Sequence, residues 1–172
     1  MKICEPIAKR IGKTLVGNDV EISKKTYGEI WEIFKNPDRD IDSSTIMYEV
    51  CKVSSKDSDL QHAITTINPI LVSGECNMTR GHFHKDETES EIYIGAGGEG
   101  LLLLCDKKGN TWTEKIFAGS VHIIPGNVGH RCINTSDEEK LYVECYWSKK
   151  AGYDYEYMEK HPFEFRVIRD NG

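Results

Sequence analysis

Long apolar runs are absent from this 172-residue sequence, and so is any excess of positive charge. No stretch approaches the roughly 18–20 consecutive apolar residues that a membrane-spanning helix requires. The first ten residues include several charged side chains and lack the apolar run of a secretory signal peptide. We therefore expect no membrane partner and a cytoplasmic location.

Negative charge dominates, because 22 Lys and Arg residues stand against 28 Asp and Glu residues, a formal net charge of -6. A protein that binds nucleic acid needs a basic surface that displaces counterions from the phosphates. The charge balance therefore excludes nucleic acid as a partner. It does not argue against a small anion bound in a local pocket.

The sequence also lacks the cysteine spacing of disulfide frameworks and zinc sites. Its six cysteines are scattered, without a C-x-x-C pair. Cys105, Cys132 and Cys145 lie in apolar or strand-like runs, where cysteine usually acts as a small buried hydrophobe. We expect reduced thiols, in agreement with a cytoplasmic location.

Short runs rich in β-branched and aromatic residues recur between turn signals, a pattern typical of an all-β barrel or sandwich. The predicted strands cover residues 45–53, 63–67, 90–94, 101–104, 111–117, 121–124, 141–147 and 163–168. Residues 1–25 have weak periodicity and predict an irregular arm, and residues 29–34 predict a short helix that ends before Pro37. We expect one compact domain, with the arm over residues 1–44 and the barrel over residues 45–172.

Four residues form a candidate set of metal ligands: His82, His84, Glu91 and His130. Because side chains alternate along a strand, His82 and His84 point to one side. Three imidazoles and one carboxylate suit a borderline divalent metal such as Fe²⁺, Mn²⁺, Ni²⁺ or Zn²⁺. An octahedral ion with four protein donors keeps two positions open for substrate oxygens. The H-x-H pattern alone is weak, since two histidines in one strand are often surface residues.

The spacing around these histidines matches the two motifs of the cupin superfamily. In the first motif, His82-x-His84 is followed by Glu91 and then, after six residues, by Gly98. The second motif consists of Gly119, Pro125, Asn127, His130 and Asn134. Asn127 replaces the usual glycine, and asparagine tolerates the same positive-φ turn. The chain therefore resembles the cupins over about residues 60–148, which implies a jelly-roll barrel, also called a double-stranded β-helix.

A subgroup is similar over a longer part of the chain. The runs T-R-G-H-F-H at residues 79–84 and E-I-Y at residues 91–93 closely resemble the metal-dependent, cupin-type glucose-6-phosphate isomerases of archaea and some bacteria. Further matches are A-I-T-T at residues 63–66, Tyr146, and A-G-Y-D-Y at residues 151–155. This resemblance covers roughly residues 45–168. It implies a sugar-phosphate substrate, a place in glycolysis or gluconeogenesis, and a homodimer.

The resemblance also implies a role for each matching residue. One divalent metal ion per chain, Fe²⁺ by first expectation, would be held by His82, His84, Glu91 and His130. The sugar phosphate would be surrounded by Thr65, Thr79, Gly81 and Tyr93. Tyr146 and Tyr155 would close on the substrate, and Glu91 and Tyr146 are the expected catalytic residues. The family often has histidine where Tyr153 stands, so Tyr153 receives no role.

An aldose–ketose interconversion moves a hydrogen between C1 and C2 of an open-chain sugar. It needs a Lewis acid to polarise the carbonyl and a base for proton transfer. Glu91 is the only carboxylate of the ligand set and therefore the best candidate base, although a metal-bound carboxylate is weaker than a free one. A hydride shift would need no base, and the sequence leaves both routes open.

Other polar residues carry weaker expectations. Arg80 and Lys85 flank the histidines and are candidates for phosphate contact. Alternation over residues 141–147 places two groups on opposite faces of the strand. We expect the polar group to face a wet cavity and the apolar group to pack against another layer or subunit. These groups are Tyr142, Glu144 and Tyr146, and Leu141, Val143, Cys145 and Trp147.

Two other functions fit the same ligand set. A cupin oxygenase would use three histidines and a glutamate to present iron to O₂. A non-catalytic cupin would bind a sugar phosphate or a metal without turnover, because one scaffold serves many functions. A metal-dependent glucose-6-phosphate isomerase remains the leading hypothesis.

Overall fold

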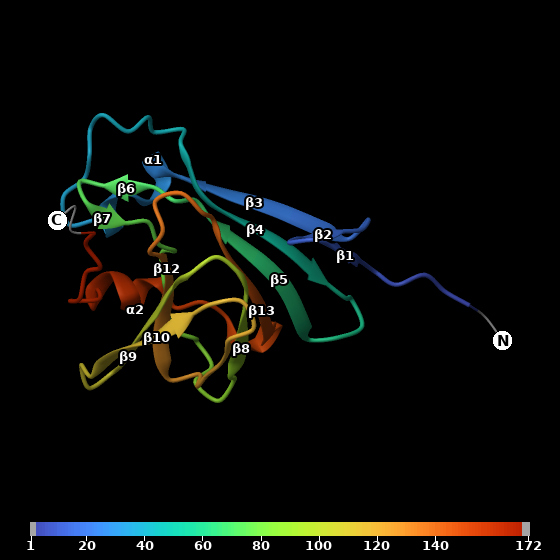
Figure 1. The fold of residues 1–172 in the computed structure, drawn as a ribbon. Helices are drawn as coiled ribbons and strands as arrows, with labels where there is room; N and C mark the ends of the chain where they lie inside the picture. Colours follow the sequence, from blue (N-terminus) through green and yellow to red (C-terminus); the bar gives the residue numbers. More distant parts are fainter. Residues whose placement is uncertain (1–2, 170–172) are drawn as a thin grey trace.

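Strands dominate the computed structural model, which describes residues 3–169 (Figure 1). The strands are β1 (Lys9–Ile11), β2 (Thr14–Val16), β3 (Val20–Thr26), β4 (Ile46–Ser54), β5 (Leu60–Ile67), β6 (Leu71–Val72), β7 (Glu75–Cys76), β8 (Glu91–Gly97), β9 (Gly100–Asp106), β10 (Thr111–Ile116), β11 (Val121–Ile124), β12 (Val128–Asn134) and β13 (Leu141–Ser148). The helices are α1 (Tyr27–Ile30) and α2 (Tyr155–Lys160), with 3₁₀ turns at Trp31–Ile33 and Lys149–Ala151. The predicted all-β class is confirmed.

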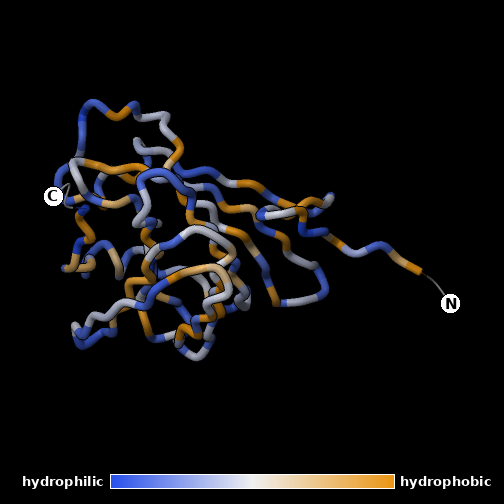
Figure 2. The backbone as a smooth tube through the Cα atoms, viewed as in Figure 1, coloured by the Kyte–Doolittle hydropathy of each residue, from blue (hydrophilic) through white to orange (hydrophobic). Residues whose placement is uncertain are grey.

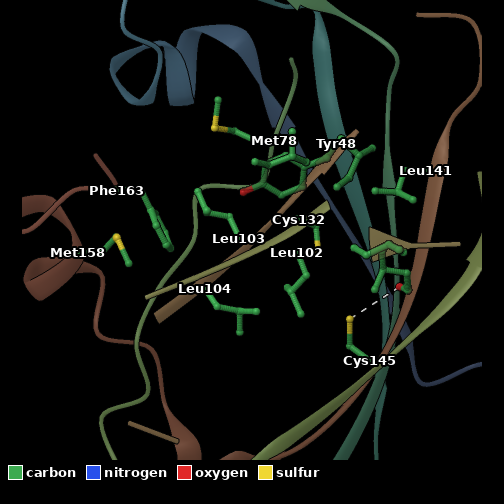
Figure 3. Packing of buried hydrophobic residues seen from close by; sticks show 14 of the residues in the cluster. Tyr48, Met78, Leu102, Leu103, Leu104, Cys132, Leu141, Cys145, Met158 and Phe163 are labelled. Carbon is green, nitrogen blue, oxygen red and sulfur yellow. Dashed lines mark hydrogen bonds between the residues drawn. The ribbon is translucent and has the colours of Figure 1, made fainter. Parts of the chain in front are cut away.

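Two antiparallel sheets provide the frame of the molecule. The larger sheet has the strand order β11-β8-β13-β5-β4-β3, and the smaller one has the order β10-β9-β12. Side chains from both sheets belong to one apolar cluster, which includes Leu102 and Leu104 of β9 and Leu141 and Cys145 of β13 (Figure 3). Strands β4 and β5 contribute buried residues to this cluster and to a second, smaller one, and Figure 2 shows hydrophobic and hydrophilic residues mixed along both strands.

The N-terminal segment is more regular than its sequence predicts. Strands β1 and β2 form a hairpin, and β3 pairs with β4 as the edge strand of the six-stranded sheet. The prediction of an irregular arm is therefore wrong for these parts of the described residues. Most β3 side chains are exposed, so backbone pairing with β4, rather than an apolar pattern, holds this strand in place.

The predicted helix at residues 29–34 corresponds to α1 and the turn after it. Two other predictions about strands need correction. Residues 163–168 form no strand, because their backbone pairs only with the two-residue strand β7, through the bridge from Glu75 to Ile168 and the bond from Cys76 N to Val167 O. Strand β12 had no predicted bounds, since all seven of its residues are buried and show no alternation. In the described part of the chain, no helix is long and apolar enough to cross a membrane.

Candidate metal centre and cavity

The four candidate ligands come from three segments that the fold brings together. His82 and His84 lie in the connection between β7 and β8, Glu91 is the first residue of β8, and His130 lies in β12. One possible ligand atom from each residue lies within 4.8 Å of the others. His82 N donates to His130 O at 3.2 Å, and His130 N donates to His82 O at 3.1 Å. This backbone pairing places the two motifs side by side.

A glycine permits this close approach. Gly81 has a φ of 76°, in the left-handed region that side chains rarely adopt. A Cβ atom at this position would lie 3.0 Å from His130 O and 3.1 Å from Arg131 Cβ. A larger residue would therefore be strained in this backbone conformation and would crowd the pairing of the His82 segment with β12.

Hydrogen bonds orient two of the imidazole rings. His84 Nδ1 lies 2.6 Å from Glu89 O, and His130 Nδ1 lies 3.1 Å from Val128 O. Because a carbonyl oxygen only accepts, each Nδ1 carries the hydrogen. In the neutral form of each ring, the Nε2 lone pair then faces the centre of the cluster, as in histidines that ligate metals.

The contacts around Glu91 require a cation. Its Oε1 atom lies 3.1 Å from His84 Nε2 and 2.5 Å from His130 Nε2. A carboxylate oxygen and a ring-nitrogen lone pair repel each other unless a proton or a metal ion lies between them. Burial raises the pKa of Glu91, but the charges and hydrogen bonds of His130 and His84 outweigh burial and hold that pKa well below its ordinary value.

The donors that lack partners fit a divalent metal ion. The Nε2 atom of His82 is buried and forms no hydrogen bond within residues 3–169, and the Nε2 atom of His130 faces only the Glu91 carboxylate, 2.5 Å from its Oε1. Burial, and then the charge of His130, lower the pKa of His82 well below its usual value, so this ring stays neutral and able to ligate. Burial lowers the pKa of His84, but the hydrogen bond and charge of Glu91 raise it above its usual value, so a metal ion would displace a proton there. Three imidazoles beside one ionised carboxylate match the nitrogen and oxygen donors of Fe²⁺, Mn²⁺, Ni²⁺ or Zn²⁺ sites.

A cavity of about 380 Å³ lies against this cluster, within the range typical of small-molecule sites. His82, Glu91 and His130 form part of its wall, whereas His84 lies in the cluster but outside the lining. The wall also includes five residues that the sequence assigned to the substrate or to closure: Thr65, Thr79, Gly81, Tyr93 and Tyr155.

Tyr146 lies away from this cavity, and the expected orientation of its strand is wrong. The apolar face of β13 points inward, and Cys145 and Trp147 line the cavity. Tyr146 lies on the opposite face, where its hydroxyl donates to Glu144 Oε1 at 2.7 Å and its ring stacks on His62. Alternation separates the two faces of a strand correctly, but it does not say which face a barrel encloses.

Sequence reasoning missed a large part of the cavity wall. Beyond Trp147 and Cys145, the missed residues are Glu21, Ile22, Ser23, Lys25, Tyr48, Val50, Lys52, Ala63, Cys132 and Tyr153. Most lie at alternate positions of β3, β4, β5 and β13, so one face of the large sheet forms the floor of the cavity. Strand alternation combined with known pairing could have found them.

Of the two basic residues that flank the histidines, Arg80 lies at the cavity and Lys85 does not. Arg80 lines the cavity, where its guanidinium lies 5.0 Å from the Tyr155 ring centre. Lys85 is exposed and does not line the cavity, so the structure gives no support to its expected phosphate contact. The Tyr153 ring packs edge-on against His82 at 4.8 Å, which places this residue beside the cluster although it was assigned no role.

Comparisons with known proteins agree with this geometry. The sequence matches the family described as glucose-6-phosphate isomerase (GPI) over residues 24–172. A glucose-6-phosphate isomerase from Pyrococcus horikoshii is 34% identical over 129 residues, which span 74% of this chain and 68% of that protein. One from Sinorhizobium medicae is 33% identical over 120 residues, which span 69% of this chain and 56% of that protein.

Solved structures support the fold. The oxalate decarboxylase of Lactobacillus farciminis aligns with a TM-score of 0.50 and 23% identity, over 63% of this chain and 30% of that one. The FeII form of HppE aligns with a TM-score of 0.50 and 11% identity, over 78% of this chain and 59% of that one. At these identities the likeness concerns the fold alone, and it confirms the cupin barrel.

Proposed function

Because the chain belongs to the glucose-6-phosphate isomerase family and is an enzyme of that family, we propose that it interconverts glucose 6-phosphate and fructose 6-phosphate with one bound divalent metal ion. The observation that carries the proposal is the convergence of three imidazoles on the buried Glu91 carboxylate at a cavity of about 380 Å³. The Nε2 atom of His82 has no protein partner there, and that of His130 faces only the carboxylate. This arrangement offers donors to a cation and room for a sugar.

His82, His84, Glu91 and His130 would hold the ion. A divalent cation bound there would supply a Lewis acid that polarises the sugar carbonyl and its neighbouring hydroxyl. Glu91 faces the cavity as an ionised carboxylate and would accept the proton from C2 or C1 and return it to the other carbon. Its low pKa makes it a weak base, so the route depends on the carbonyl making the C–H group more acidic.

The remaining cavity residues would bind and orient the sugar phosphate. Thr79 Oγ1 accepts a hydrogen bond from Cys132 N at 3.1 Å, which leaves the hydroxyl hydrogen free to donate to a ligand oxygen. Burial raises the pKa of Tyr93 well above its ordinary value, so its hydroxyl stays neutral and can donate. Thr65 and Tyr155 add further hydroxyl groups, and Gly81 lets a ligand approach the backbone closely.

We further propose Fe²⁺ as the first candidate metal, a cytoplasmic location and a homodimer. The free thiols support a reducing compartment, since five of the six cysteines are buried and none is paired. Edge strand β11 exposes Val121 and Ile123, which supports a contact with a second copy. Elemental analysis of the purified protein tests the metal, and light scattering tests the homodimer.

A coupled assay of fructose 6-phosphate conversion tests the proposed reaction. We expect activity in the purified protein, loss of nearly all activity after chelation, and recovery when a divalent metal is returned. Activity that is indifferent to a chelator would overturn the metal mechanism. Oxygen consumption with turnover would favour a cupin oxygenase, and tight sugar-phosphate binding without turnover would favour a binding protein.

A further inference from the structure

Arg131 is a buried arginine without a carboxylate partner. Its exposed fraction is 4%, and it takes part in none of the ion pairs within residues 3–169. The arginines that do form ion pairs there are Arg10, Arg80, Arg166 and Arg169. A guanidinium group keeps its charge in proteins, and a buried charge is costly unless it is paired. A group that is retained at such a cost calls for an explanation beyond packing.

The contacts of Arg131 lie on the segment that precedes the histidines. Its Nη2 donates to Arg80 O at 2.8 Å, and its Nη1 lies 2.8 Å from Met78 Sδ, which is a weak acceptor. The guanidinium carbon lies 4.6 Å from the centre of the Phe163 ring, and Nε is buried without a partner within residues 3–169. The bond to Arg80 O is the strong hydrogen bond among these contacts, because it joins a charged donor to a carbonyl oxygen.

Arg131 approaches this segment from outside the cavity. His130 and Cys132 of β12 line the cavity, and alternation places Arg131, which lies between them in the strand, on the opposite face. Arg131 is accordingly not part of the wall, whereas Arg80 and Gly81 are. The Arg80 carbonyl group therefore points away from the cavity, toward the guanidinium group.

The peptide bond between Arg80 and Gly81 turns this contact into a donor at the cavity. No cis peptide bond is present within residues 3–169, and in a trans peptide the C=O and N–H groups point in opposite directions. Because Arg80 O faces Arg131 behind the wall, the Gly81 N–H group faces the cavity.

This N–H group differs from its neighbours in having no backbone partner. Thr79 N donates to Cys132 O at 2.9 Å, and His82 N donates to His130 O at 3.2 Å. Gly81 N, by contrast, donates to no backbone oxygen within residues 3–169. It is therefore available to an acceptor in the cavity.

We propose that Arg131 is a positioning residue for substrate binding, which fixes the peptide between Arg80 and Gly81 so that Gly81 N–H donates to a ligand oxygen. This inference rests on the proposed function, because it takes the sugar phosphate as the ligand. Glycine at a φ of 76° has wide conformational freedom, and a peptide next to it rotates easily unless its carbonyl group is held. A donor that is already oriented costs less entropy when the ligand binds.

Two substitutions at Arg131 separate the hydrogen bond from packing. In Arg131→Met, which removes the donor and keeps an apolar chain, we expect the KM for fructose 6-phosphate to rise about tenfold while kcat stays within about twofold. Arg131→Lys retains a charged donor, so we expect its KM to stay within about threefold of the unmodified value. If Arg131 only supported the fold, the methionine variant would lose stability and its KM would not move, which would overturn the assignment.

Arg166→Met is the matched control. Arg166 also donates to a backbone carbonyl, that of Ile33, and it lies 3.2 Å from Glu75 Oε1 without lining the cavity. We expect this variant to be less stable, because Glu75 loses its partner, and to keep the unmodified KM. A rise in KM equal to that of Arg131→Met would show that the loss of either arginine disturbs the cavity, and it would refute a specific role for Arg131.

NMR spectroscopy observes the peptide itself. Arg80 is the only arginine that is followed by glycine in the sequence. Labelling arginine with ¹³C at the carbonyl carbon and glycine with ¹⁵N therefore gives a single correlation signal, that of the peptide between Arg80 and Gly81. In the zinc-loaded protein, we expect the amide proton of this signal to shift when fructose 6-phosphate is added. In Arg131→Met, we expect a changed carbonyl frequency and a much smaller shift on addition of the sugar phosphate.

The same signal separates this inference from the proposed function. If the protein has no isomerase activity but the Gly81 amide shifts with fructose 6-phosphate, and shifts less in Arg131→Met, the proposed reaction fails and the positioning role stands. If the amide of the unmodified protein does not respond, or responds equally in both proteins, the role of Arg131 is refuted whatever the activity.

Discussion

Glu91 and Glu144 are two glutamates of the large sheet with nearly equal burial and very different surroundings. Their exposed fractions are 4% and 5%. Glu144 is satisfied by the protein, because the Tyr146 hydroxyl donates to it at 2.7 Å, His62 Nε2 lies at 2.8 Å, and Arg10 Nη1 lies at 2.9 Å. Glu91 contacts imidazole nitrogens, and within residues 3–169 it has no lysine, arginine or hydroxyl partner.

The difference shows that one face of the large sheet carries a structural carboxylate, whereas the other carries a carboxylate that remains available for binding. A buried carboxylate is costly unless it is paired and hydrogen-bonded. On the face of β13 that points away from the cavity, Arg10 of the N-terminal hairpin supplies part of that compensation. The ion pair between Arg10 and Glu144 therefore ties the hairpin to β13. On the inner face, the compensation is left to a cation from solution, and a carboxylate with incomplete partners marks a functional site.

The largest expected effect is that of a substitution at Glu91, the carboxylate that faces the cavity. Glu91→Gln removes both the negative donor and the candidate base, so we expect kcat to fall at least 100-fold and bound metal to drop below one equivalent. Elemental analysis and the coupled isomerase assay measure the two effects. A variant that keeps its metal and its full rate would remove Glu91 from the mechanism.

The matched substitution at Glu144, on the face away from the cavity, should lower stability and leave activity and metal content unchanged. Glu144→Gln leaves the Arg10 charge without its partner and weakens the contact with His62, so we expect the free energy of unfolding to fall by about 2–4 kcal/mol. Metal content and kcat should stay within about twofold of the unmodified values at temperatures where the variant is folded. Chemical denaturation gives the stability. A large loss of activity in the folded variant would contradict the separation of the two faces.

Adjacent residues of β13 sharpen the comparison further. Trp147 lies directly across from Glu91 in the β13–β8 register and lines the cavity, so we expect Trp147→Phe to lower kcat/KM about tenfold. Tyr146→Phe removes only the bond to Glu144, so it should cost about 1 kcal/mol of stability and leave kcat/KM within about twofold. Equal kinetic losses in both variants would show that the tyrosine reaches the substrate after all.

The smallest expected effect lies at α1, whose residues contact neither of the two carboxylates in the contacts described above. Glu29 accepts a hydrogen bond from Thr26 N at 2.8 Å, and this bond, together with Lys25, lowers its pKa from 4.5 to about 2. A carboxyl group with a lowered pKa stabilises the fold above pH 4.5, and it loses that contribution as the pH falls towards 2. Because the group is exposed, we expect Glu29→Gln to cost only about 0.5–1 kcal/mol at pH 7.

Denaturation of both proteins at several pH values measures this effect. The difference in the free energy of unfolding should shrink as the pH is lowered from 4.5 towards 3. A difference that stays constant over this interval would show that the ionised Glu29 carboxylate is not the stabilising group.

Local sequence signals predicted much of the strand content and failed where tertiary pairing takes over. Strands β8 to β11 and β13 lie where alternation and turns indicate them, because each has clear punctuation at its ends. Strand β3 escaped prediction because its side chains are mostly exposed, and β12 because its side chains are all buried. Neither strand shows the one-sided burial from which periodicity is detected.

The sequence by itself determined which donors are available, since the spacing of His82, His84, Glu91 and His130 depends only on the order of residues. Only the tertiary structure decided which face of β13 encloses the cavity, and therefore that Trp147 replaces Tyr146 in its wall. The physical reason is that alternation fixes which residues share a face, whereas the inside of a barrel is defined by how distant strands close around it. The same closure brings Lys52 of β4 into the wall of a cavity whose candidate metal ligands lie on β8, on β12 and in the connection between β7 and β8.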